Sequence, residues 1–192
     1  TVFGSAVGLG AVGSLVLLSY SFLRSVADSL FIHYIGSENL HLGWIYTGVA
    51  ITFSVLLYNR LVHRLHTLHL FSGLVLLSLL LGSFFWILIY RGHQSAIIPF
   101  YVFKEVYVIF LVEQIWTLCA LLFANQSAKL FYGFFMTIAT IGAVGGNIIS
   151  ATLVHRVGTL NIALFGLGTL ALIFMLMIPL LIKPQFFPIS QS

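Results

Sequence analysis

Residues 157–182 read VGTLNIALFGLGTLALIFMLMIPLLI and contain no Asp, Glu, Lys or Arg. Roughly 20 apolar residues cross the hydrocarbon core of a bilayer as an α-helix, so this run is long enough to span a membrane with some tilt. The run lacks the alternation of polar and apolar residues that marks a transmembrane β-strand. A helix satisfies its own backbone hydrogen bonds in lipid, and we therefore predict a transmembrane helix here.

Four further stretches have the same character, because none of them holds a charged residue: 1–23, 39–59, 65–90 and 130–155. Charged residues make up 6% of the 192 residues, whereas a soluble domain carries about 25% to cover its surface. The predicted fold class is therefore an all-α integral membrane protein in a lipid bilayer. We expect one domain over 1–183, with transmembrane helices near 5–34, 40–62, 68–90, 97–124, 128–154 and 160–182. Residues 184–192 hold two prolines and are expected to form a linker or tail.

The cations near the predicted helix ends give an orientation. Arg60, Arg64, Lys129 and Lys183 fall on one side of the membrane, and Arg91 and Arg156 fall on the other. Lys and Arg are enriched in cytoplasmic connections, so we expect both termini in the cytoplasm. The chain starts without Met or a basic segment, and we expect a chain without a signal peptide that begins inside a longer one or lacks its first residues.

A short internal match indicates repetition. Residues 61–68 read LVHRLHTL and residues 153–160 read LVHRVGTL, identical at six of eight positions. They connect predicted helices two and three, and helices five and six. Three helices repeated in inverted orientation form the six-helix halves of many secondary transporters. We predict such a 3+3 inverted repeat; the alternative is a chance match.

Charged residues occur in the middle of two predicted helices. Helix one holds Arg24 and Asp28, and helix four holds Lys104, Glu105 and Glu113. These would be the first helices of the two repeats, which line the cavity when such repeats assemble. A charge at a helix centre costs about 2.5 to 3.5 kcal/mol on insertion scales, so such residues are seldom kept without a use. We predict that these five residues line a substrate or ion pathway.

Spacing suggests how these charges are paired. Arg24 and Asp28 are four residues apart on one face and can pair, with mutual neutralisation in helix packing as the alternative role. Lys104 and Glu105 lie shallower and can extend towards the interface. Glu113 lies about 21 Å along the helix from Pro99, near mid-membrane. It needs a partner from another helix, for which Arg24 is the candidate; the alternative is a protonated carboxylic acid bonded inside the bundle.

Several function classes find no support in the sequence. There is no Gly-rich phosphate loop or nucleophile–base motif, so neither an enzyme nor a cofactor is expected. His63, His66 and His69 recur every three residues without a nearby Cys, Asp or Glu, so no metal site is expected. The eight Lys and Arg residues are scattered and form no nucleic-acid-binding patch. Gly142 and Gly146 have the spacing typical of close helix packing.

Five short motifs are similar to a known family: RSVADSL at 24–30, GSE at 36–38, EQIW at 113–116, FAN at 123–125 and AKLFY at 128–132. With them the chain resembles the amino-terminal half of the ATP/ADP translocases of intracellular bacteria and plastids, and related bacterial proteins of the major facilitator type. The resemblance implies half of a major facilitator fold, nucleotide exchange, a bacterial inner membrane, and a transport path lined by Arg24, Asp28 and Glu113. Ala27 stands where that family has a Lys, and His63 where the general major facilitator signature has an Asp.

Two functions follow as hypotheses. The first is half of a secondary transporter that moves a small anionic metabolite by alternating access. Arg24 would contact the anion, and Asp28 and Glu113 would act as gating or proton-coupling carboxylates. The site of such a fold lies between two halves, so a second six-helix half or a partner subunit is required. The alternative is a transporter-derived, non-transporting structural subunit of a larger membrane complex.

Overall fold

A computed structural model of the chain describes residues 2–62, 64–122 and 128–182. Within these ranges the chain forms six long helices and no strand. The helices are α1 (Val2–Ile35), α2 (Leu40–Val62), α3 (Thr67–Tyr90), α4 (Ile97–Leu122), α5 (Ala128–Val157) and α6 (Thr159–Ile182), with short 3-10 helices η1 (Ser37–Asn39) and η2 (Gln94–Ala96). Each long helix contains a segment that is long and apolar enough to cross a membrane. The predicted all-α fold class with six such helices is confirmed.

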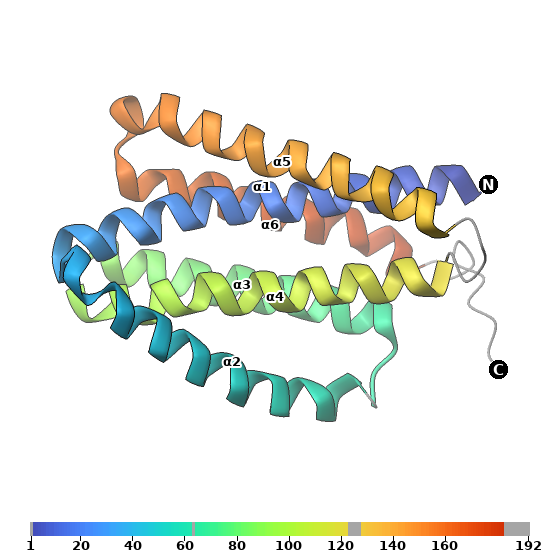
Figure 1. Ribbon diagram of the computed structural model, residues 1–192, viewed down its shortest axis with the longest axis horizontal. Helices are drawn as coiled ribbons and strands as arrows, with labels where there is room; N and C mark the ends of the chain where they lie inside the picture. Colours follow the sequence, from blue (N-terminus) through green and yellow to red (C-terminus); the bar gives the residue numbers. More distant parts are fainter. Residues whose placement is uncertain (1, 63, 123–127, 183–192) are drawn as a thin grey trace.

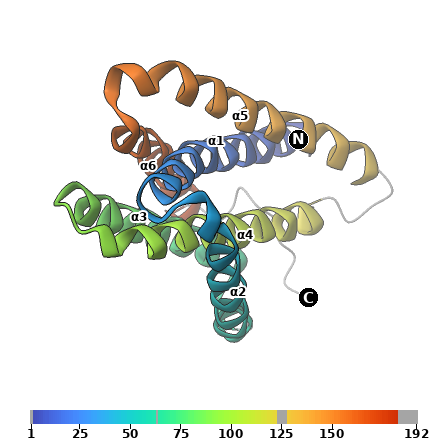
Figure 2. The same cartoon turned by 60° about the vertical axis from the view of Figure 1, so that its left-hand side comes forward.

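The six helices run back and forth along the long axis of the molecule (Figure 1). The starts of α1, α3 and α5 and the ends of α2, α4 and α6 lie at one end of the bundle. α1 packs on α5, α6 and α4, whereas α4 packs on α1, α3 and α2, and α3 also packs on α6. Figure 2 shows α2 and α5 on opposite sides of the other four helices. The centre of the molecule is therefore built from α1, α3, α4 and α6.

The central helices are more buried than the outer helix α2. Of the apolar segment of α4 that could cross a membrane, 56% is buried inside the chain, against 11% of the corresponding segment of α2. The core contains Leu23 and Val26 of α1, Phe100 and Leu111 of α4, and Leu170 of α6. Exposed side chains on α2 include large apolar residues such as Trp44, Phe53 and Leu57. Apolar side chains pack favourably against lipid tails, so α2 is suited to the lipid-facing edge of the bundle.

Small residues bring α1 and α5 together, as the spacing of Gly142 and Gly146 predicted. A Cβ atom on Gly142 would lie 2.1 Å from the carbonyl oxygen of Ser14, and one on Gly146 would lie 2.7 Å from Cβ of Ser21. The Ser21 hydroxyl donates a 2.9 Å hydrogen bond to the carbonyl oxygen of Ala143. Close backbone approach and interhelical hydrogen bonds are the usual sources of helix association in lipid.

Helix α5 extends three residues beyond its predicted end near residue 154. The helix continues to Val157, with His155 and Arg156 in its last turn. Cations are favoured there because they face the negative end of the helix dipole. The stop comes from Gly158, which has φ +83° and donates a 3.0 Å hydrogen bond to the Val154 carbonyl. Only Gly158 separates α5 from α6.

Several sequence features lie outside the described residues. They are His63, the motif at 123–125, Lys183 and the tail 184–192. α4 was predicted to reach residue 124, and its described part ends at Leu122. The side chain of Lys129 also lies outside the described part.

Candidate functional site: a charged cluster between α1 and α4

Three polar residues follow one face of α1. Tyr20, Arg24 and Asp28 are each four residues apart, which places them one above the other on the helix surface. The neighbouring Ala27 is fully buried in the core, so α1 presents its apolar side to the bundle and its polar stripe at the edge of the core. The stripe lies beside α4, on which α1 packs.

Apolar and hydroxyl contacts set the register of α1 against α4. The rings of Phe31 and Tyr101 have centroids 4.5 Å apart. Twelve residues earlier in α1 and six residues later in α4, the hydroxyls of Ser19 and Tyr107 lie 3.4 Å apart. Because the two helices are antiparallel, these contacts bring Lys104 and Glu105 of α4 level with the polar stripe of α1.

The five residues Tyr20, Arg24, Asp28, Lys104 and Glu105 form a continuous network, called here the charged cluster. Nζ of Lys104 lies 3.0 Å from Oδ1 of Asp28 and 2.6 Å from Oε1 of Glu105. Nε of Arg24 lies 3.4 Å from Oδ2 of Asp28. The Tyr20 hydroxyl donates to both carboxylate oxygens of Glu105, at 3.1 and 3.0 Å. Two cations thus meet two carboxylates, and their formal charges cancel.

Exposure divides the charged cluster into an inner and an outer part. The side chain of Lys104 is 1% exposed, whereas that of Arg24 is 58% exposed. Asp28 and Glu105 are partly exposed, and Asp28 joins Lys104 to Arg24. Lys104 also lies 4.2 Å from the ring centroid of Tyr101, a distance at which the ring face attracts a cation. A buried cation needs such partners, because an uncompensated one is very costly.

The structure shows the partners of Arg24, Lys104 and Glu105. The Arg24–Asp28 pair is confirmed. The expectation that Lys104 extends to the membrane interface is wrong, because its ammonium group is buried between Asp28 and Glu105. Glu105, for which the same was expected, is held by Tyr20 and Lys104.

Glu113 lies apart from the charged cluster, so the prediction that it pairs with Arg24 is wrong. The antiparallel register places Arg24 level with Lys104 and Glu105, and Glu113 is about 12 to 14 Å further along the axis at 1.5 Å per residue. Arg24 instead pairs with Asp28. The side chain of Glu113 is exposed and points about 80° round α4 from Glu105, towards α2, where its charge acts on Tyr58. The next residue, Gln114, is buried and donates a hydrogen bond to the Tyr58 hydroxyl of α2.

Two parts of the site were missed from the sequence. One is Tyr20, whose signal was its position four residues before Arg24. The other is the ion pair between Lys104 and Asp28, for which no sequence signal exists because it joins two helices.

The charged cluster has the chemistry of an anion contact rather than of a metal centre. The side chain of Arg24 is largely exposed, and a guanidinium group can bind a carboxylate or phosphate through two parallel hydrogen bonds. Asp28, Glu105 and Glu113 are carboxylates at membrane depth, which are the groups that relay protons in many transporters. Among the described residues, no group of three or more His, Cys, Asp or Glu could hold a metal ion.

Comparison of the chain with protein-family models, with curated proteins and with solved structures gives no match.

Proposed function

We propose that the chain is one half of a secondary transporter, in which the charged cluster contacts a small anionic solute during alternating access. One observation carries the proposal: two central helices bring four charges together at membrane depth, and one of the cations, Arg24, remains accessible. Charges in this environment are rare and usually mark a solute or ion path. Arg24 is the proposed anion contact, and Asp28 and Glu113 are the proposed gating or proton-coupling carboxylates.

The helix neighbours support a 3+3 inverted repeat and half of a major facilitator fold. α1 packs on α5 and α6, and α4 packs on α2 and α3, although α2 makes a smaller contact than α5. If α1, α2 and α3 are exchanged with α4, α5 and α6 respectively, the same pairs of helices are in contact. The two similar stretches, LVHRLHTL and LVHRVGTL, lie at opposite ends of the bundle, as an inverted repeat requires.

The exposed charges support a requirement for a second half. Arg24 and Glu113 are exposed on the chain as it stands. If these side chains met lipid, each would cost about 2.5 to 3.5 kcal/mol on insertion scales. A second six-helix half, from a longer chain or a partner subunit, would replace lipid by protein and a water-filled path. By resemblance, the proposed solute is a nucleotide or a similar anion.

Transport in liposomes tests the proposal. The native-length protein, purified with any partner it retains, is reconstituted with internal ATP, and uptake of labelled ADP is measured, with labelled phosphate and succinate as further probes. Arg24→Gln removes a charged hydrogen-bond donor, so uptake at low solute concentration should fall about ten- to a hundredfold. Arg91→Gln, at the end of the bundle away from residue 64, is the matched control and should keep wild-type uptake.

Absence of uptake for all three anions, or equal loss in both variants, would overturn the transporter proposal. The masses of the native chain and of the particle it forms in mild detergent then test the alternative, a transporter-derived structural subunit of a membrane complex. The observation that favours this alternative is that Lys104 is sealed between Asp28 and Glu105, with Ala27 buried where the resembled family has a cation. A short native chain held in a large particle would support it; a chain of about twice this length in a small particle would support the transporter.

A further inference from the structure

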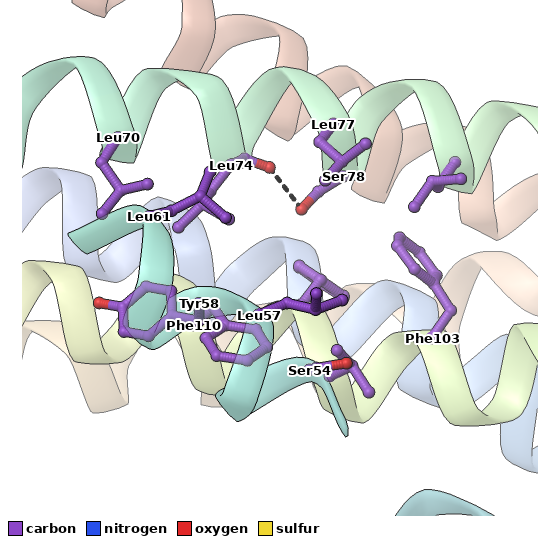
Figure 3. Close-up of a pocket in the computed structure, with 13 residues that line it drawn as sticks. Ser54, Leu57, Tyr58, Leu61, Leu70, Leu74, Leu77, Ser78, Phe103 and Phe110 are labelled. Atoms are coloured by element: carbon purple, nitrogen blue, oxygen red, sulfur yellow. Dashed lines mark hydrogen bonds between the residues drawn. The ribbon is translucent and has the colours of Figure 1, made fainter. Parts of the chain in front are cut away.

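A groove runs between α2, α3 and α4, on a different side of α4 from the charged cluster. It has a volume of about 320 Å³ and is lined mainly by Leu and Phe side chains, among them Leu57, Leu61, Leu70, Leu74, Phe103 and Phe110 (Figure 3). Glu105 follows Phe103 by two residues, which places the two side chains on opposite faces of α4. A second transporter half that covers the charged cluster does not have to cover this groove.

The groove exists because α2 diverges from α3. At its start α2 is close to the core, since a Cβ atom on Gly43 would lie 2.9 Å from the Tyr101 ring and 3.2 Å from the Phe31 ring. Towards its end α2 leans away from the bundle (Figure 2). Leu57 and Leu77 line the groove and are exposed, so the groove is open along its length to the surrounding apolar medium.

The length of the groove matches one leaflet of a bilayer. On α3 its lining extends from Leu70 to Leu81, which is about 16 Å along the helix axis at 1.5 Å per residue. The hydrocarbon core is about 30 Å thick, so one leaflet contributes about 15 Å. Near its deep end the hydroxyl of Ser78 donates a 2.7 Å hydrogen bond to the Leu74 carbonyl, so it offers little to a polar ligand. The groove is thus suited to a single acyl chain.

The shallow end of the groove carries a net positive charge, from two exposed cations and one exposed carboxylate, Glu113, whose charge acts on the lining residue Tyr58. Leu61 and Leu70 line the groove beside the connection between α2 and α3. Arg60, in the last turn of α2, and Arg64, in this connection, are both exposed. Basic groups between transmembrane helices at the interface attract anionic lipid headgroups. The occupant that fits both ends has a negative headgroup and a long apolar tail.

We propose that this groove binds one anionic phospholipid, with an acyl chain along Leu57 and Leu74 and the phosphate group beside Arg60 and Arg64. A transmembrane helix of a partner is a poorer fit, because a helix about 10 Å across and about 16 Å long occupies more than about 1,000 Å³, against about 320 Å³ in the groove. The proposal does not depend on transport, since none of these residues belongs to the charged cluster.

Native mass spectrometry of the chain in mild detergent tests the proposal, with dioleoyl phosphatidylglycerol, dioleoyl phosphatidylcholine and inorganic phosphate as probes. One phosphatidylglycerol should bind more tightly than phosphatidylcholine, and phosphate alone should not bind. Arg60→Gln and Arg64→Gln should each weaken the binding of phosphatidylglycerol about fivefold, which is the effect of losing one cation near a headgroup. Arg91→Gln, at the other end of α3, should leave binding unchanged.

The part of the groove proposed to hold the acyl chain is tested by Ser54→Phe. This variant places a ring in the groove and should weaken the binding of both lipids. Thr52→Phe adds the same ring on an exposed face of α2 that does not line the groove, and should bind like the wild type. A phosphatidylglycerol with a photoreactive acyl chain, used on the unaltered chain, should label peptides of α2 and α3 that line the groove. Equal binding of both lipids, equal effects of the paired variants, or labelling elsewhere would overturn the proposal.

Discussion

Lys104 is the residue on which the charged cluster depends most. Its ammonium group is 1% exposed and lies within 3.0 Å of Asp28 and 2.6 Å of Glu105. Removing one member of a buried ion pair is costly, because the other member remains charged and desolvated. Both carboxylates would lose their nearest cation at once, although they keep some contact with water or with a covering partner.

Replacing Lys104 should therefore destabilise the fold. Lys104→Met keeps the length of the side chain and removes the charge, and we expect a loss of about 3 to 5 kcal/mol. Unfolding of the purified chain in detergent micelles measures it. Arg24→Gln is the control, because that guanidinium is 58% exposed, and its loss should cost at most about 1 kcal/mol. Equal losses in the two variants would contradict this account of the charged cluster.

The sequence located the charged residues but could not determine which of them meet. Arg24 and Asp28 were paired correctly because their contact lies within one helix, where spacing fixes geometry. The partners of Lys104 and Glu113 depend on how far α1 is shifted along α4. That shift is set by contacts such as Phe31 with Tyr101, which no spacing rule predicts.

At the scale of helices, the α1–α5 contact has the least room for change. Gly142→Ala would put a Cβ atom 2.1 Å from the carbonyl oxygen of Ser14, and backbone atoms cannot move aside cheaply. We expect a loss of about 1 to 3 kcal/mol from overpacking, measured by unfolding in the same micelles.

Gly145 provides the matched control for this change. It lies in the same helix, and a Cβ atom there would meet nothing within 4 Å. Gly145→Ala should be neutral, or stabilise by up to about 1 kcal/mol through helix propensity. A loss as large in Gly145→Ala as in Gly142→Ala would show that close approach is not the cause.

Most helix limits could be predicted, because charge-free runs and polar connections alternate clearly. α2 was predicted at its observed limits, and α3 and α6 each within one residue. The end of α5 was not, because His155 and Arg156 resemble a polar connection although they form the last turn. The divergence of α2 from α3 also left no signal, since the apolar residues that line the groove look the same as lipid-facing ones.

For the whole molecule, the distribution of Lys and Arg predicts which end of the bundle faces the cytoplasm. In a Cys119→Ala background, His66→Cys and Ser95→Cys would place single thiols at exposed positions at the two ends without altering the Lys and Arg count. A membrane-impermeant maleimide added to intact spheroplasts of a bacterial host should label the residue 95 variant. The residue 66 variant should react only after the membrane is opened. The reverse pattern would contradict the orientation.

The close contact between α1 and α5 also has a consequence for biosynthesis. About 90 residues separate the end of α1 from the start of α5, and at about 5 to 20 residues per second the ribosome needs roughly 5 to 20 seconds to make them. Throughout that interval the hydroxyls of Ser14 and Ser21 and the narrow face that later receives Gly142 and Gly146 have no α5 to meet. The helix α1 thus completes its tightest contact only when α5 arrives, and a ribosome that stalls before α5 would leave this face of α1 open to other membrane proteins.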